Sequence, residues 1–300
     1  MTKILVTGGS GFIGSNLVRL LLNEGYEVCL VLRESSNLSR LSDISERCLI
    51  KRFSSYKGLQ NDIIYFRPDL VVHLASSQAR KGETDSEVIQ SNIMFGISIL
   101  EALQRLDYQI TFINTDTCLP KNLNRYALSK TQFSEWGRSI AESNTSITFI
   151  NVYLQMVYGP GDDLSKFPSY IVHSCYENVN DLKLSAGLQL RDFIYIDDVI
   201  SAYLTLIENI NNFKSFVEVP LGTGISISVK EFVETAHKLT RSSTKLLFDT
   251  VPLRKNEPKE CIADPALLYS LGWQTKFSFI EGLQEMINYE SKLDKSKDDR

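Results

Sequence analysis

The order of apolar and polar positions along the first half of the chain predicts strands that alternate with helices. Short apolar runs with β-branched centres occupy 3–7, 26–33, 69–76, 109–115 and 146–154. Between them, apolar residues recur at helical spacing after residue 12, before Arg67, over 86–106 and from Tyr126 to about Ser143. The stretch 34–57 is polar and weakly patterned, so no element is assigned there. This alternation is typical of an α/β fold with a parallel, doubly wound sheet.

A glycine-rich turn joins the first strand to the first helix. Gly8, Gly11 and Gly14 stand three residues apart, and Gly9 completes a second spacing, G-x-G-x-x-G. Glycines let the backbone turn tightly and approach a pyrophosphate, while the amides at the helix start hold the negative charge. Between a strand and an amphipathic helix the pattern predicts dinucleotide binding, with an ordinary glycine-rich turn as the alternative.

Tyr126 and Lys130 lie four residues apart in a predicted helix, so both side chains project from one face. A phenol beside an ammonium is a proton donor whose pKa is drawn down from about 10. Alone, this spacing usually means two surface residues. Together with the glycine turn, it predicts proton transfer beside a dinucleotide.

The two features together resemble the extended short-chain dehydrogenase/reductase family, of the NAD-dependent epimerase/dehydratase type. Further segments resemble the motifs of that family in their usual order. They are VVHLA at 71–75, SNIMFG at 91–96, VYGPGD at 157–162, RDFIYIDDV at 191–199, GTG at 222–224, RKNEP at 254–258 and LGW at 271–273. The resemblance therefore covers nearly the whole chain.

This resemblance implies a Rossmann-type domain with a smaller C-terminal substrate-binding lobe, an organisation that suits 300 residues. The dinucleotide-binding domain is expected over 1–158, with a return of the chain around 194–218. The nucleotide-sugar-binding lobe is expected over 159–193 and 219–290. The charge-dense residues 291–300 are expected to form a frayed tail.

The resemblance also assigns cofactor-binding positions residue by residue. They are Gly8, Gly11, Phe12, Ile13, Gly14, Arg33, Leu74, Ala75, Tyr126 and Lys130.

The end of the second strand sets the choice of cofactor. An acidic residue there binds the ribose hydroxyls of NAD, whereas an arginine accommodates the phosphate of NADP. The usual aspartate is absent, and Arg33 can face the phosphate with Ser35, Ser36 or Arg40 as further donors. NADPH is therefore expected to be preferred and NADH is the second choice, because Glu34 would also suit a ribose. The alternative for Arg33 is a surface side chain along the sheet edge.

The segment 112–120 lies where the family keeps a hydroxyl residue beside the carbonyl oxygen of the substrate. Its residues 114–117 resemble the Ser-Thr-Asp-Glu of nucleotide-sugar 4,6-dehydratases, so Thr115 joins Tyr126 and Lys130 in the expected catalytic set. Thr117 stands in place of the glutamate base, which argues against dehydration. Ser76 and Asp116 are expected to contact the substrate, although Asp116 would equally suit a strand-end turn.

Three residues of the second half resemble the ligands of a nucleoside diphosphate. Arg191 begins the motif at 191–199, and Arg254 and Glu257 match R-x-x-E-P, in which the glutamate accepts from nucleoside hydroxyls. Two guanidiniums that converge on one diphosphate can each bind it bidentately. The structural alternative is an ion pair of Arg191 with Asp192 or Asp197.

The chain departs from the family pattern at two places. Met156 stands where an asparagine usually contacts the substrate phosphate, and the spacer from Thr115 to Tyr126 lacks the usual Val-Tyr-Gly. One wall of the sugar pocket is therefore expected to be reduced. The combination of motifs most resembles the 4-ketoreductases that finish CDP-abequose or dTDP-D-fucose for bacterial surface polysaccharides such as O-antigen.

Charge and composition limit the kinds of binding partner expected for this chain. The net charge of −4 gives no reason to expect nucleic acid or a membrane surface. No signal peptide, membrane span or metal-binding pattern is recognised. The five scattered cysteines are expected to be reduced thiols of a cytoplasmic protein, and Cys118 is given no catalytic part. The resemblance implies a homodimer.

The expected function is NADPH-dependent reduction of the C4 ketone of a dTDP- or CDP-linked 4-keto-6-deoxyhexose. Tyr126 would donate the proton, Thr115 would hold the same oxygen, and Lys130 would bind the nicotinamide ribose. A 4-epimerase with tightly held NAD would use the same residues. A non-catalytic NADP-sensing protein of this fold is a further alternative, but it would have no need of a proton donor.

Overall fold

A computed structural model describes residues 1–79 and 82–298. The chain forms two compact units, here called unit 1 (Met1–Leu154 and Ile200–Pro220) and unit 2 (Gln155–Val199 and Leu221–Arg300). The expected boundaries, at 158 and around 194–218, lie within a few residues of this division.

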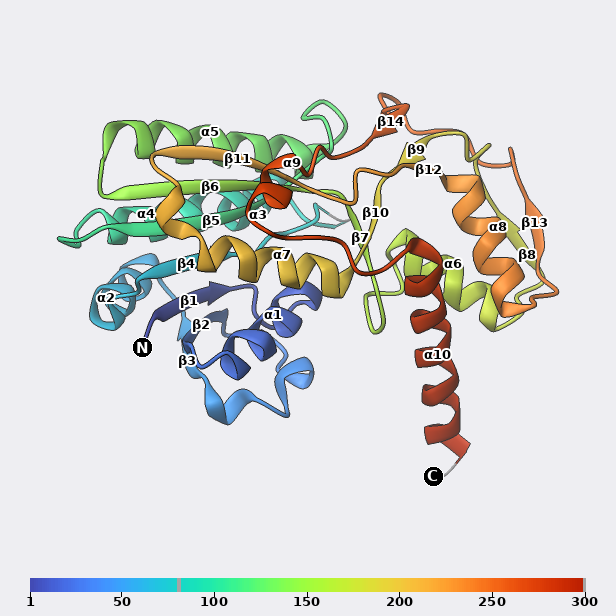
Figure 1. Cartoon of the computed structure of the whole chain (residues 1–300), viewed down its shortest axis with the longest axis horizontal. Coiled ribbons are helices and arrows are strands. Elements are labelled where there is room, and N and C mark those ends of the chain that lie inside the picture. The colour runs from blue at the N-terminus through green and yellow to red at the C-terminus, as the bar shows by residue number, and fades with distance from the viewer. Residues whose placement is uncertain (80–81, 299–300) are drawn as a thin grey trace. The chain divides into compact units, whose positions relative to one another are not determined.

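Unit 1 is built on a seven-stranded sheet with the order β11-β6-β5-β4-β1-β2-β3 (Figure 1). The ladders between neighbours from β6 to β3 are parallel. The strands are β1 (Lys3–Thr7), β2 (Glu27–Arg33), β3 (Leu49–Phe53), β4 (Leu70–His73), β5 (Ile110–Thr117), β6 (Ile147–Leu154) and β11 (Phe216–Leu221). The strand order reverses at β1, and this confirms the predicted doubly wound fold. Loops from β1 and β4 diverge there, which is where such folds bind ligands.

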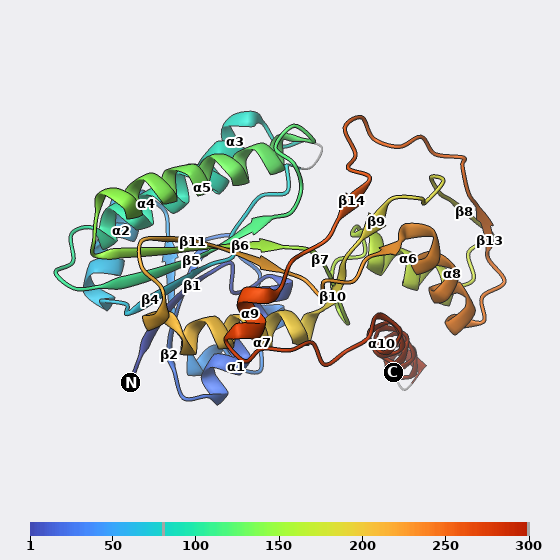
Figure 2. The same ribbon diagram turned by 45° about the horizontal axis from the view of Figure 1, so that its top comes forward.

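Helices cover both faces of this sheet because its strands are apolar on both sides. Figure 2 shows α5, α4 and α2 on one face, and α1 and α7 on the other. These helices are α1 (Phe12–Asn23), α2 (Tyr56–Phe66), α4 (Phe95–Leu103), α5 (Arg125–Ser143) and α7 (Ile196–Glu208). The start and end of α5 agree with the helix predicted from Tyr126 to about Ser143.

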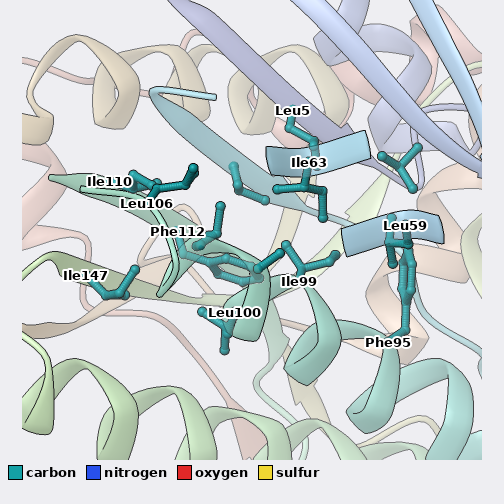
Figure 3. Close-up of a cluster of buried hydrophobic side chains, with 14 of the residues drawn as sticks. Leu5, Leu59, Ile63, Phe95, Ile99, Leu100, Leu106, Ile110, Phe112 and Ile147 are labelled. Carbon is teal, nitrogen blue, oxygen red and sulfur yellow. The ribbon is translucent and has the colours of Figure 1, made fainter. Parts of the chain in front are cut away.

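One cluster of the apolar core lies between the sheet and the α2–α4–α5 layer (Figure 3). Phe112 of β5 stacks on Phe149 of β6, with ring centroids 5.2 Å apart. Gly96 lets α4 approach α5 closely, because a Cβ there would lie 2.2 Å from the Phe133 ring. Tight packing of this layer fixes the axis of α5, which carries Tyr126 and Lys130.

The structure differs from the predicted elements of unit 1 in two places. The weakly patterned stretch 34–57 contains β3 and two short 3-10 turns, at Ser39–Leu41 and Ser45–Arg47. The single helix expected over 86–106 is divided into α3 (Asp85–Ile89), a π-helical segment η3 (Gln90–Met94) and α4. The sequence pattern did not predict β3 because β3 lies at the edge of the sheet, where a strand needs little apolar surface. Hydrogen bonds of Asn92, described below, accompany the second.

Unit 2 combines helices with short strand pairs, and its elements were predicted only as a second lobe. Its helices are α6 (Phe167–Tyr176), α8 (Val229–Thr240), α9 (Ala266–Ser270) and α10 (Phe279–Asp298). The strands are β7 (Met156–Tyr158), β8 (Asp181–Lys183), β9 (Leu190–Arg191), β10 (Phe193–Tyr195), β12 (Ile227–Ser228), β13 (Lys245–Leu247) and β14 (Glu260–Cys261).

Most of the stretch 291–300, expected as a frayed tail, lies in α10, which continues to Asp298. Lysine and leucine in 291–298 are good helix formers and extend a helix that has already begun. Residues 299 and 300 lie outside the described part of the chain.

Candidate functional site

The glycine turn after β1 brings two stretches of backbone into close contact. Gly8 has a φ of +69°, and a Cβ there would lie 2.6 Å from the amide nitrogen of Ala75, just after β4. A Cβ on Gly14 would lie 2.2 Å from the carbonyl oxygen of Gly8, and the Gly11 amide donates to that same oxygen at 2.9 Å. Glycine is therefore required by conformation at residue 8 and by space at residue 14.

A cavity of about 380 Å³ opens where these loops leave the sheet. Its wall includes Gly8, Ser10, Gly11, Arg33, Ser36, Leu74, Ala75, Ser76 and Gln90. Phe12 is buried and Ile13 half-buried at the start of α1, so their expected contribution is the backbone of the helix N-terminus. The glycine turn, the cavity and the helix start fit a dinucleotide pyrophosphate. Ser76, expected at the substrate, lies in this same wall.

The far end of the cavity carries the residues that were expected to choose the cofactor. Arg33, which is itself exposed, and Ser36 line the cavity, whereas Glu34, Ser35 and Arg40 are not among the lining residues. Arg52 of β3 donates to the carbonyl oxygens of Arg33 at 3.0 Å and Glu34 at 2.7 Å, and its guanidinium also reaches that of Ser36. Sequence reasoning missed Arg52 because no element was assigned to its stretch.

Tyr126 and Lys130 are held on α5 by a capped helix start. The Asn124 side chain accepts a hydrogen bond from the Ala127 amide at 2.8 Å, which begins the helix one residue before Tyr126. The Lys130 side chain is buried, and burial lowers the pKa of its ammonium to about 8, while Asp116 opposes part of that shift. A buried amine with a lowered pKa is an unusual and costly group, which is typical of a functional position.

The expected depression of the Tyr126 pKa is wrong in this structure. Burial, with Asp116 and the Cys118 thiol as smaller causes, raises the pKa of Tyr126 to about 12, and a hydrogen bond with Thr117 lowers it only in part. Lys130 is not among the causes. Desolvation of the phenol outweighs any attraction to the ammonium, so Tyr126 is a protonated donor at neutral pH.

Asp116 lies in a buried polar network beside these two residues. Its carboxylate accepts from the Asn151 side chain at 2.9 Å and from the Thr117 amide at 2.8 Å. Asn114 donates to Asn151 at 2.7 Å, so three side chains of β5 and β6 form one chain of hydrogen bonds. Burial raises the pKa of Asp116, while Lys130 and the two hydrogen bonds oppose this. The carboxylate thus contacts protein groups, and its expected contact with substrate stays a prediction.

Thr115 projects from the opposite side of β5, because side chains alternate along a strand. It is half-buried, and its hydroxyl forms a short hydrogen bond with the phenol of Tyr203 on α7. The structure therefore places Thr117 at the phenol of Tyr126 and Thr115 at the phenol of Tyr203. Tyr203 was not recognised from the sequence, although it lies four residues after the end of the motif at 191–199.

Asn92 is a second residue that sequence reasoning left without a role. It is fully buried in the π-helical segment, donates to the Ser77 carbonyl and to the Ser129 hydroxyl at 2.9 Å each, and accepts from the Ser77 amide. Ser129 lies between Tyr126 and Lys130 and donates to the Tyr126 carbonyl. Asn92 thereby links the loop after β4 to the helix of the candidate acid. Its place in an N-x-x-G segment was the available signal.

Unit 2 has a cavity of its own, of about 300 Å³. Arg254 and Glu257 line it together with Met156, Phe167, Tyr170, Lys183, Gln189 and Phe248. Arg191 is buried, is not among the lining residues, and forms an ion pair with Glu257. The carboxylate of Asp192 accepts instead from Thr223, Gly224 and Ala263 amides, so the alternative Arg191–Asp192 pair is not formed. Arg254 therefore lies in the cavity wall, whereas Arg191 lies outside that wall and pairs with Glu257.

Metal and membrane sites receive no support from the described residues. Across 1–79 and 82–298 no three His, Cys, Asp or Glu side chains gather as a metal site would need. No helix in those ranges has the length and apolarity to cross a membrane. The five cysteines form no disulfide bond with one another.

Known proteins resemble this chain over almost its full length. The sequence model of the NAD dependent epimerase/dehydratase family matches residues 4–219. CDP-abequose synthase of Salmonella muenchen is 31% identical over 95% of this chain and 97% of the relative. UDP-glucose 4-epimerase of Yersinia enterocolitica is 25% identical over 94% of this chain and 96% of the relative. The solved UDP-glucose 4-epimerase of Thermotoga maritima with UDP-glucose has a TM-score of 0.84 at 23% identity, over 97% and 99% of the two chains, which shows a shared fold.

Replacing Arg33 tests the far end of the unit 1 cavity. Arg33→Ala should weaken NADPH by about 1–3 kcal/mol and NADH much less, because a charge-assisted contact to the extra phosphate is lost. Fluorescence titration with both cofactors measures this. Glu34→Gln, next to Arg33 but outside the cavity wall, serves as the matched control. Equal losses for the two cofactors would make Arg33 a surface residue.

The pKa of Lys130 predicts a pH dependence of cofactor binding. Its ammonium is charged below about pH 8, so NADPH affinity should be highest there and fall by up to about tenfold per pH unit above it. The free energy of unfolding should rise over the same range, because the unfolded chain keeps the proton that the folded chain has lost. Lys130→Met should abolish both trends, and a pH-independent affinity of the wild type would contradict the assignment.

Arg254 and Arg191 should differ in how they affect the unit 2 cavity. Arg254→Ala should raise KM for a nucleotide-linked ketose about ten- to a hundredfold, because one charge-assisted contact of roughly 1.5–3 kcal/mol is removed. Arg191→Ala should raise KM too, but also lower the melting temperature, since the carboxylate of Glu257 loses its buried partner. Steady-state kinetics and thermal unfolding separate the two. Unchanged KM in both variants would reject a diphosphate at this cavity.

Proposed function

Because the chain belongs to the NAD dependent epimerase/dehydratase family, we propose that it is an NADPH-dependent 4-ketoreductase of a nucleotide-linked 4-keto-6-deoxyhexose. The family and the similarity to CDP-abequose synthase identify a nucleotide-sugar-modifying enzyme of the oxidoreductase/epimerase kind. The proposal adds the direction of the reaction, the cofactor and the sugar. Its product would be a 6-deoxyhexose such as dTDP-D-fucose or an abequose-type sugar for O-antigen precursors.

The observation that carries this proposal is the protonated phenol of Tyr126. Ketone reduction consumes a proton at the carbonyl oxygen, so the acid must be protonated at working pH. Tyr126 is half-buried and has a pKa raised to about 12, which meets that need. Epimerisation must first remove a proton from a C4 hydroxyl, which needs the phenolate. The protonated phenol therefore supports reduction, as does the higher identity to CDP-abequose synthase, at 31%.

The residues of unit 1 would divide the work at the C4 carbonyl. Tyr126 would donate the proton, the hydroxyl of Thr115 would hold the oxygen, and Lys130 would bind ribose hydroxyls of the dinucleotide. NADPH, when bound, supplies the hydride. Thr117 replaces the acidic side chain that a 4,6-dehydratase needs, so elimination of water is not part of the proposal.

The proposed cofactor and the proposed substrate are each supported by a different cavity. Arg33 and Ser36 in the wall of the unit 1 cavity support NADPH over NADH. Arg254 and Glu257 in the unit 2 cavity support a nucleoside diphosphate, dTDP or CDP, as the group that anchors the sugar. A cytoplasmic location and a homodimer stay predictions.

A 4-epimerase with retained NAD is the second candidate, and one observation favours it. Relatives named UDP-glucose 4-epimerase match this chain at 25% identity over nearly its full length. They rank in identity below the CDP-abequose synthase relative, at 31%. A non-catalytic NADP-sensing protein is a weaker alternative, because it would leave the buried Lys130 and the adjacent phenol without use.

Turnover of defined ketoses tests the proposal. Purified enzyme with NADPH and either CDP- or dTDP-linked 4-keto-6-deoxyglucose should consume one NADPH for each reduced sugar formed. Tyr126→Phe should lower kcat by about 10²–10⁴, as expected on loss of a general acid. Tyr65→Phe, a change at an exposed tyrosine of α2, is the control and should leave kcat unaltered.

Three results would overturn parts of this proposal. Interconversion of C4 epimers without net NADPH consumption would establish the epimerase. No reaction and no cofactor oxidation with any nucleotide-linked ketose would favour the sensing protein. Near-normal turnover by folded Tyr126→Phe would remove Tyr126 as the acid and leave the reaction class standing.

A further inference from the structure

Tyr203 is a buried polar residue of unit 1 to which no motif gave a role. It lies on α7 with its side chain fully buried, on the face of the sheet opposite α5. Its phenol contacts the hydroxyl of Thr115, 88 positions earlier in the chain. Within the described residues this is the one hydrogen bond of the phenol.

The direction of that hydrogen bond follows from counting donors and acceptors. Each of the two hydroxyls has one hydrogen and can also accept. If Thr115 donated to Tyr203, the buried phenol hydrogen would have no acceptor, which is unfavourable for a buried polar group. If Tyr203 donates to Thr115, the buried phenol hydrogen has an acceptor, which is the threonine oxygen. The hydrogen of the threonine hydroxyl is then free, and Thr115 is half-buried, so it can reach a ligand.

We propose that Tyr203 is a positioning residue that donates to Thr115 and so directs the threonine hydrogen to the carbonyl oxygen of the substrate. The inference rests on the proposed reduction at C4. No bond is made or broken at Tyr203, and its proton stays on the phenol throughout. The two hydroxyls thus give two consecutive hydrogen bonds, one from Tyr203 to Thr115 and one from Thr115 to the substrate oxygen on which negative charge develops.

Burial strengthens the hydrogen bonds that lead from Tyr203 through Thr115 to the substrate. A donor next to the Thr115 oxygen polarises the threonine O–H and strengthens the hydrogen bond that it gives. Desolvation raises the pKa of Tyr203, with the nearby phenol of Tyr126 as a smaller cause, so Tyr203 stays a donor at any working pH. Donors fixed before the reaction stabilise a developing oxyanion without reorganisation. Thr115 therefore needs Tyr203 for its orientation and for part of its donor strength.

A double-mutant cycle on kcat tests this dependence. Thr115→Val should lower kcat by about 10²–10³, the usual effect of losing one oxyanion donor. Tyr203→Phe removes a single oxygen and should lower kcat about ten- to a hundredfold, with KM for the ketose and NADPH affinity nearly unchanged. Tyr203→Phe added to Thr115→Val should change kcat no further, because the phenol acts through the threonine hydroxyl. Added to Thr115→Ser, which keeps a hydroxyl, it should again lower kcat.

Tyr108→Phe is the matched control. Tyr108 precedes β5 in unit 1 and donates to the Pro68 carbonyl at 3.2 Å, so the same oxygen is removed at the other end of the strand. It should leave kcat unaltered while lowering the melting temperature by a similar amount to Tyr203→Phe.

The outcomes distinguish this inference from the proposed function. Equal losses from Tyr203→Phe in the wild-type and Thr115→Val backgrounds would show a purely structural phenol and overturn the inference. An unaltered kcat of Tyr203→Phe would overturn it as well. Both results leave the ketoreductase standing. A wild type that reduces no nucleotide-linked ketose would reject the proposed function and, with it, any catalytic use of Tyr203.

Discussion

The close contact between the backbone of Gly8 and that of Ala75 is the constraint on which the candidate site depends. It fixes the carboxyl ends of β1 and β4 at the distance that only a residue without a side chain permits. The cavity of unit 1 opens from this contact, and the start of α1 faces it. Ser77, two residues after Ala75, is then positioned to bond Asn92, which in turn reaches Ser129 on the Tyr126 helix. One glycine thus orders groups on three elements.

Local patterns were sufficient to predict the elements and the residues that share one helix or one turn. Tyr126 and Lys130 lie on one face because the helical repeat places positions four apart together. The glycine turn was found because a strand and an amphipathic helix enclose it. β3 was missed because its exposed edge position requires little of its side chains, and only Ile50, Lys51 and Phe53 of the strand are half-buried. The interruption of the helix at Asn92 left no trace in apolar spacing.

Contacts between distant residues could not be predicted in the same way. Arg191 and Glu257 were each recognised as ligands, but their ion pair joins positions 66 apart. Thr115 and Thr117 share one face of β5 because they stand two positions apart, yet Thr115 bonds Tyr203 and Thr117 bonds Tyr126. The partner of each therefore depends on which distant element packs beside it. The pKa of Tyr126 was misjudged for a related reason. Spacing indicates the neighbouring ammonium, whereas desolvation depends on every element that packs around the phenol.

Arg52 shows that the backbone geometry of a cavity-lining turn can depend on a residue of the neighbouring strand. Its guanidinium donates to the carbonyl oxygens of Arg33, the last residue of β2, and of Glu34 and Ser36 in the turn that follows, and so it holds the backbone from which the Arg33 side chain extends. Arg33 is predicted to supply the charge, and a residue of the neighbouring strand β3 holds its backbone. An attempt to re-engineer the dinucleotide preference by exchanging side chains in the turn alone would inherit a loop still shaped by β3. Evolutionary change of preference in this chain would accordingly require paired substitutions on two strands.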